Sequence, residues 1–158
     1  MFQGFITYAK TNRKELYESL LLIPAFSLYA LLNQYVVSCV ETEGPSMKPT
    51  FNDSNIALVD RFYYKRTGLK KGDIIVATSP IDPKTQVCKR IIHLPGEIKE
   101  IETELYTEHM RIPENHVWIE GDNKNNSFDS RNHGPLPIEL IQGKIVYSLF
   151  PFKSLYPE

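Results

Sequence analysis

Ser46 and Lys89 are the two residues of this sequence best suited to perform chemistry together. Ser46 lies in a Gly-Pro-Ser-Met-Lys-Pro-Thr stretch, and Lys89 lies in a run of apolar and β-branched residues. A serine hydroxyl is a poor nucleophile at neutral pH unless a nearby base takes its proton. Strand alternation places Lys89 on the same face as Val87 and Ile91, where apolar surroundings lower the pKa of a lysine. We therefore predict a nucleophilic Ser46 with Lys89 as its general base.

Each of these residues has a structural interpretation when it is taken alone. A serine after Gly-Pro is commonly a turn residue, and a lysine in a strand commonly points to solvent. Competing catalytic motifs are absent from the sequence. It contains neither the His-Glu-x-x-His pattern of a zinc hydrolase nor the Gly-x-Ser-x-Gly elbow of a Ser-His-Asp esterase, and its four histidines are His93, His109, His116 and His133. We expect no metal and no cofactor.

A third stretch carries further candidate residues. It begins with Gly-Asp-Asn at residues 121–123 and continues with Asn-Ser-Phe-Asp-Ser-Arg at residues 126–131. Together with the stretch around Ser46 and the Cys-Lys-Arg-Ile-Ile run around Lys89, it resembles the type I signal peptidase family in motif order and spacing. The resemblance covers residues 44–151 and implies a Ser/Lys endopeptidase.

The resemblance also implies roles for individual residues. Ser127 matches the serine that hydrogen-bonds the catalytic lysine, and Asp129 with Arg131 matches a charged pair that supports the active-site loop. The backbone N–H of Ser46 is the expected oxyanion donor. Many bacterial members add a serine hydroxyl two residues before the nucleophile. That position is Gly44 here, so a second donor must come from the backbone or from water.

Several details resemble the members of the family found in the mitochondrial inner membrane. They are the Ser-Pro-Ile-Asp-Pro stretch at residues 79–83, Cys88, Asn123 and the Gly-Pro-Leu-Pro stretch at residues 134–137. This likeness implies removal of sorting sequences from precursor polypeptides delivered to the intermembrane space, beside a related second subunit. The alternatives are a bacterial-type signal peptidase, a self-cleaving repressor-type protease, and a non-catalytic anchored subunit that stabilises a partner peptidase.

Composition excludes one class of partner and limits covalent cross-links. The chain has 158 residues, a net charge of −1 and no basic cluster on a helical pattern, so we expect no nucleic acid partner. Its two cysteines, Cys39 and Cys88, are too few for a disulfide framework. We expect no bridge between them.

A long uncharged run precedes the chemical motifs. No charged residue occurs from Ser19 to Val40, and we predict a transmembrane helix over residues 20–40. A buried helix of a soluble protein and a cleavable signal or lipoprotein site are the alternatives. Basic residues before the run and acidic residues after it place residues 1–19 on the matrix side, with the catalytic domain, residues 41–158, on the opposite side.

Short β-branched runs separated by turn residues follow the nucleophile motif. This spacing predicts a mostly β, compact antiparallel domain rather than alternating βα units. The segment between Gly96 and Gly121 is too short for an inserted domain, which predicts a minimal catalytic unit. The expected strands cover residues 56–59, 73–77, 86–92, 98–101, 117–119 and 144–149.

Overall fold

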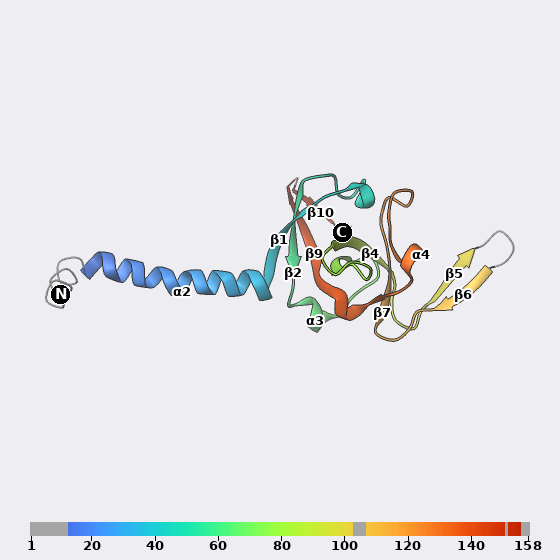
Figure 1. Ribbon diagram of the computed structural model, residues 1–158, viewed down its shortest axis with the longest axis horizontal. Coiled ribbons are helices and arrows are strands. Elements are labelled where there is room, and N and C mark those ends of the chain that lie inside the picture. Colours follow the sequence, from blue (N-terminus) through green and yellow to red (C-terminus); the bar gives the residue numbers. More distant parts are fainter. Residues whose placement is uncertain (1–12, 103–106, 151, 156–158) are drawn as a thin grey trace.

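The computed structural model describes residues 13–102, 107–150 and 152–155, and consists of a long helix that leads into a β domain (Figure 1). The helix is α2 (Arg13–Tyr35). The remaining elements follow in the order β1 (Val37–Thr42), η1 (Pro45–Met47), β2 (Asn55–Asp60), α3 (Tyr64–Thr67), β3 (Ile74–Thr78), β4 (Gln86–His93), β5 (Ile98–Glu102), β6 (Thr107–Arg111), β7 (His116–Glu120), α4 (Ser130–His133), β8 (Leu136–Pro137), η2 (Ile138–Leu140), β9 (Ile141–Phe150) and β10 (Phe152–Ser154).

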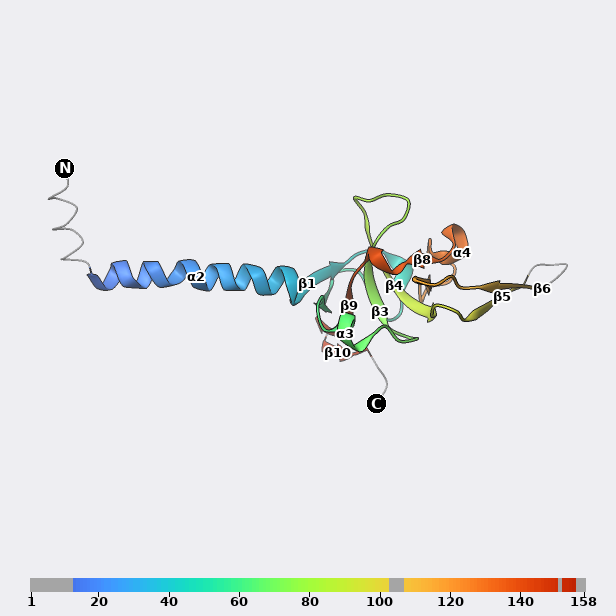
Figure 2. The ribbon, with the colours of Figure 1, turned by 90° about the horizontal axis from the view of Figure 1, so that it is seen from below.

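Helix α2 extends away from the β domain in both perpendicular views (Figures 1 and 2). The side chains from Leu20 to Leu32 are exposed, and most of them are apolar. Among the residues that the structure describes, no helix combines the length and the apolar character that crossing a membrane requires. Of the predicted matrix-side segment, residues 1–12 lie outside the described residues.

The helix ends five residues earlier than the sequence predicted. Residues 37–40, which we assigned to a membrane helix, form the first part of β1. This strand pairs with β2 from Val37 opposite Asp60 to Thr42 opposite Asn55. Ser38 and Thr42 point inward while Cys39 is exposed. The β-branched residues of this stretch suit a strand, and a partner strand far away in sequence decides the outcome.

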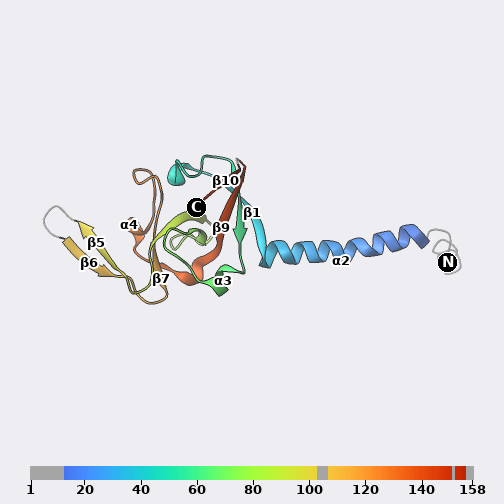
Figure 3. The ribbon, with the colours of Figure 1, turned by 180° about the vertical axis from the view of Figure 1, so that it is seen from behind.

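The strands form one large antiparallel sheet and one hairpin. The 8-stranded sheet has the order β1-β2-β9-β3-β4-β7-β8, and β10 pairs with β9. Strands β5 and β6 form a separate hairpin that projects from the end of the domain opposite to α2 (Figure 3). The antiparallel β domain predicted from the sequence is therefore confirmed, and each of the six expected strands is present.

Strand β3 organises the core because both of its faces are buried. Ile74 and Val76 belong to one apolar cluster, and Ile75 and Ala77 belong to a second. A continuous apolar run is typical of a strand that is covered on both sides. The first cluster includes Met47 of η1, so the core itself fixes the short helix that carries Ser46.

We predict that Gly143→Ala destabilises the domain. A Cβ atom at this position of β9 would meet the side chain of Val59 and the backbone oxygen of Asp60. Overpacking of this kind costs about 2 kcal/mol of the free energy of unfolding, which denaturant titration of the purified chain measures. Glu108→Ala, at an exposed position of β6, is the control. Equal stability of both variants would show that β9 does not pack this closely on β2.

Candidate active site

The structure brings Ser46 and Lys89 into hydrogen-bonding contact. Ser46 is the middle residue of η1, Lys89 lies in β4, and Lys89 Nζ donates to Ser46 Oγ over 2.9 Å. Lys89 alternates with Ile91 on the buried face of the strand, as the sequence predicted. The two side chains therefore have the separation that proton transfer between a hydroxyl and an amine requires.

Lys89 is held in an environment that disfavours its charge. The residue is 5% exposed, and burial lowers the pKa of its amine, although the nearby Asp129 carboxylate acts in the opposite direction. Its Nζ also donates to the backbone oxygen of Cys88 over 3.0 Å. An amine that loses its proton at this position has a lone pair available to Ser46 Oγ. The arrangement can therefore generate a serine nucleophile.

The loop that follows β7 holds the backbone on both sides of the nucleophile. Asn123 donates through its backbone N–H to the Ser46 oxygen (2.9 Å) and through Nδ2 to the Pro45 oxygen (3.1 Å). Gly121 lies so close that an added Cβ would meet the Ser46 oxygen and the Ser127 side chain. The structure shows that space, and not a left-handed backbone, requires this glycine.

Asp129 is the hydrogen-bonding centre of this loop. Its carboxylate is fully buried and accepts bonds from the Gly121 N–H (2.9 Å) and from Ser127 Oγ (2.7 Å). Arg131 donates through Nε and Nη2, each over 2.9 Å. Burial alone would raise the pKa of Asp129, but the bonds from Arg131, Gly121 and Ser127 hold it well below its usual range. Asp129 also caps α4, with Asn132 completing a capping box.

Ser127 occupies a different place in the network from the one that the family resemblance implied. Its hydroxyl donates to Asp129, while the bonds of Lys89 Nζ within the described residues go to Ser46 and Cys88. Ser127 therefore bonds to Asp129, a carboxylate whose charge acts on the pKa of Lys89. The nearby carboxylate offers the hydroxyl a charged acceptor, and such bonds are stronger than those between neutral groups.

A second ion pair, for which the sequence suggested no role, fixes the other side of the site. Arg90 Nε and Nη2 donate to the two carboxylate oxygens of Asp122 over 2.8 and 2.7 Å. Thr50 Oγ1 donates to the same carboxylate, and Arg90 Nη1 donates to the Gly72 oxygen over 2.9 Å. Arg90 follows Lys89 in the strand, so it lies on the opposite face and needs its own acceptor. Strand alternation is the feature of the sequence from which a separate partner for Arg90 could have been predicted.

Gly44 adopts a backbone conformation that explains the missing hydroxyl. Its φ is 89°, which favours glycine over serine. Its N–H donates to Asp53 Oδ1 over 3.1 Å, and Lys48 Nζ donates to the other carboxylate oxygen over 2.8 Å. These contacts close the turn that precedes η1.

A cavity of about 200 Å³ opens beside the nucleophile. Residues from two separate segments line it: Thr42, Glu43, Gly44, Ser46, Met47 and Phe51 from the first, and Gln86, Val87, Cys88 and Lys89 from β4. Burial raises the pKa of Cys88 to about 12, so its thiol is neutral at physiological pH. Both cysteines are free.

His133 lies at the end of α4 near the site. Its ring packs on Phe128 with a centroid distance of 5.9 Å, and burial lowers its pKa. Its Nδ1 is buried without a partner within the described part of the chain. In the same residues, no group of three or more metal-binding side chains gathers.

We predict that Gly121→Ala impairs catalysis more than folding. The added methyl group must displace the Ser46 backbone, and a shift of about 1 Å at a nucleophile reduces kcat/KM about 100-fold. Peptide cleavage assays combined with circular dichroism separate the two effects. Asn125→Ala, at an exposed position of the same loop, is the matched control. Full activity of Gly121→Ala would show that the loop does not position Ser46.

We predict that Asp129→Asn destabilises the protein by about 3 kcal/mol, because it leaves Arg131 without its buried carboxylate partner. The native pKa of Asp129 is depressed, so its contribution to stability is present above the ordinary aspartate pKa of about 4 and is lost as the pH falls below that value. Unfolding experiments across this pH range measure the loss. Glu114→Gln, which removes a carboxylate from an exposed position, is the control. Identical acid sensitivity of wild type and Asp129→Asn would show that ionised Asp129 does not stabilise the folded chain.

Comparison with known proteins identifies the family of the chain. Residues 14–106 and 98–150 match the family described as "Signal peptidase, peptidase S26". The chain is 40% identical over 123 residues to mitochondrial inner membrane protease subunit 1 of Mus musculus and 41% identical over 123 residues to that of Homo sapiens. Each alignment covers 77% of this chain and 74% of the relative.

A differently named relative matches a similar part of the chain. Mitochondrial inner membrane protease subunit 2 of Schizosaccharomyces pombe is 36% identical over 124 residues, which cover 77% of this chain and 69% of the relative. The family match spans most of the sequence, including all three motif stretches around Ser46, Lys89 and Asp129. The chain therefore belongs to the signal peptidase family of serine proteases.

Proposed function

We propose that the protein is a membrane-anchored endopeptidase of the mitochondrial inner membrane that removes sorting sequences from precursor polypeptides, with Ser46 and Lys89 as its catalytic dyad. One observation carries the proposal. A buried lysine amine lies 2.9 Å from a serine hydroxyl at the wall of a cavity that opens to the surface.

The proposed reaction begins with neutral Lys89. Its amine takes the proton of Ser46 Oγ as this oxygen attacks the scissile carbonyl carbon, and a tetrahedral oxyanion forms. The Ser46 N–H lies in the first turn of η1, where a helix has no internal acceptor for it, so it is available to the oxyanion. Protonated Lys89 then gives its proton to the leaving amine. A water molecule, activated by Lys89, hydrolyses the resulting ester.

The substrate path in this proposal lies between β1 and β4. Strand β7 pairs with β4 only from Arg90 onward. Among the described residues, the edge of residues 86–89 on the β7 side of the strand therefore has no partner strand. The end of β1 lies across the same cavity. An extended peptide can add to these edges through backbone hydrogen bonds. The small cavity then accepts a small side chain next to the scissile bond.

The proposed anchor is α2. Its exposed apolar side chains require a nonpolar surrounding, and the relatives with the same family motifs are named as inner membrane proteases. We propose a single membrane pass with the catalytic domain in the intermembrane space. Because a subunit 2 exists among the relatives, we also propose a related second subunit as partner.

We predict that Ser46→Ala and Lys89→Arg each reduce cleavage of a precursor peptide by at least about 1000-fold. The arginine keeps the positive charge but cannot release its proton at accessible pH. Lys70→Met removes an exposed lysine away from the site and is the matched control. The assay uses the detergent-purified full chain, with and without a second subunit whose own nucleophile is replaced. Cleavage by Ser46→Ala in the absence of that subunit would overturn the dyad.

The pH dependence provides an independent test of the base. The active form contains neutral Lys89, so kcat/KM rises with pH as the lysine loses its proton. Burial lowers this pKa, so the midpoint falls below the ordinary lysine value of about 10.4. A rate profile whose midpoint equals or exceeds that value would show that Lys89 is not the base.

A further inference from the structure

The segment from Arg61 to Lys71 combines aromatic rings with concentrated positive charge. It contains five basic residues and no acidic residue, whereas the whole chain has a net charge of −1. The positive charge is therefore a local feature of this segment. Its basic residues are Arg61, Lys65, Arg66, Lys70 and Lys71.

A fixed turn presents two of the aromatic rings to solvent. Asp60 Oδ1 accepts hydrogen bonds from the N–H groups of Phe62 (3.0 Å) and Tyr63 (2.7 Å) at the start of α3. Phe62 and Tyr63 are 47% and 64% exposed. Tyr64 instead points inward, and its hydroxyl donates to the Ile141 oxygen over 3.0 Å. The buried ring anchors the turn, so the exposed rings are held at the surface by local structure.

Two basic side chains lie beside aromatic rings of this segment, one exposed and one buried. The guanidinium of Arg66 lies 5.2 Å from the centre of the Phe62 ring, and Lys65 Nζ lies 6.0 Å from that of Tyr64. No carboxylate pairs with Lys65 or Arg66 within the described residues, whereas Lys71 pairs with Glu97 over 3.0 Å. Lys65 and Arg66 are therefore available to an external anion.

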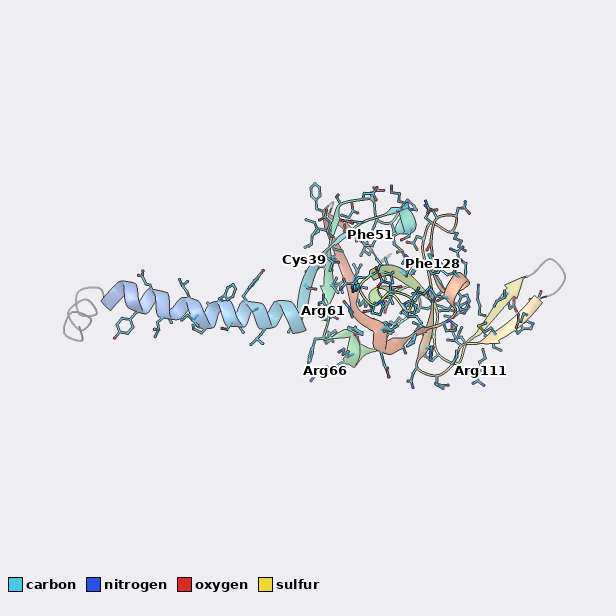
Figure 4. All side chains as sticks on the ribbon, in the orientation of Figure 1. Cys39, Phe51, Arg61, Arg66, Arg111 and Phe128 are labelled. Atoms are coloured by element: carbon cyan, nitrogen blue, oxygen red, sulfur yellow. The ribbon has the colours of Figure 1, made fainter. Side chains whose placement is uncertain are left out.

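This patch of Phe62, Tyr63, Lys65 and Arg66 lies next to the end of α2. The Arg61 N–H donates to the oxygen of Val36, the residue that follows α2, over 2.9 Å. Helix α3 lies on the side of the β domain that faces α2 in both perpendicular views (Figures 1 and 2). Arg61 and Arg66 are on this side, while Phe128 and Arg111 lie farther from the helix (Figure 4).

We propose that this patch binds the head groups of an anionic phospholipid membrane. The inference rests on the proposed anchoring of α2, because a helix inserted in a bilayer places the patch at the surface of that bilayer. Aromatic rings favour the membrane interface, and each basic side chain near an anionic surface strengthens attachment about fivefold. The contact holds the catalytic domain in one orientation above the membrane.

Photocrosslinking of the full chain tests the proposal without any measurement of cleavage. p-Benzoylphenylalanine replaces Phe62 in one sample and Phe128, which is also exposed, in the control sample. Both proteins are reconstituted into vesicles of phosphatidylcholine alone or mixed with phosphatidylglycerol. We expect lipid adducts at position 62, more of them in the anionic vesicles, and few at position 128. Equal adduct yields at the two positions would overturn the proposal.

Charge variants test whether the basic side chains of the patch cause its contact with lipid. Lys65→Gln with Arg66→Gln should lower the adduct yield at position 62 at least about fivefold in anionic vesicles. Lys84→Gln with Arg111→Gln removes the same charge from exposed positions elsewhere and should leave it unchanged. Crosslinks from position 62 to a second polypeptide in place of lipid would identify a protein interface and overturn the proposal.

Vesicle flotation separates this inference from the proposed anchoring. If the chain does not float with either type of vesicle, the anchor and the patch proposal both fail. If it floats but position 62 gives no lipid adduct, only the patch proposal fails. The peptidase proposal is tested by cleavage alone and does not depend on either result.

Discussion

The burial of the Lys89 amine is the constraint on which the rest of the structure depends. A charged lysine at this depth would lose the solvation of its ammonium group, so burial favours the neutral amine. That amine then needs hydrogen-bond partners, which Ser46 Oγ and the Cys88 oxygen supply. The doubly buried strand β3 makes this possible, because Ile75 pairs with Lys89 and the core on both sides of β3 excludes water. The same core contains Met47 and so fixes η1, which carries Ser46.

Asp129 and Lys89 show how one site favours the charged form of one titratable group and the neutral form of another. Both are almost completely buried, but the lysine lies beside its apolar strand partner Ile75, whereas hydrogen-bond donors surround the carboxylate. Asp129 therefore stays ionised, while the Lys89 ammonium is destabilised. Divergent environments of this kind are how one fold keeps one ionisable group charged and favours the neutral form of another. The ionised carboxylate holds the 121–131 loop, and this loop in turn holds the backbone of Ser46.

Local patterns predicted those features that depend on neighbours in sequence. Strand alternation predicted the inward direction of Lys89, and the turn residues separated the six expected strands. The end of α2 could not be predicted in this way, because residues 37–40 are apolar enough for a helix and become a strand only through pairing with β2. The acceptor of Ser127 and the partners of Arg90 also depend on distant residues. The need for glycine at residue 121 could not be predicted in this way either, because its close contact with the Ser46 oxygen exists only in the folded chain.

Arg131 connects the stability of the loop to the electrostatic environment of Lys89. The negative charge of Asp129 acts to raise the pKa of Lys89 and thus opposes its neutral form. The two-point contact of Arg131 places a compensating positive charge directly on that carboxylate. The pair is therefore more than a loop anchor. Because the net charge near the lysine amine is smaller with Arg131 in place, the site can use a buried carboxylate for rigidity while burial continues to control the proton of Lys89.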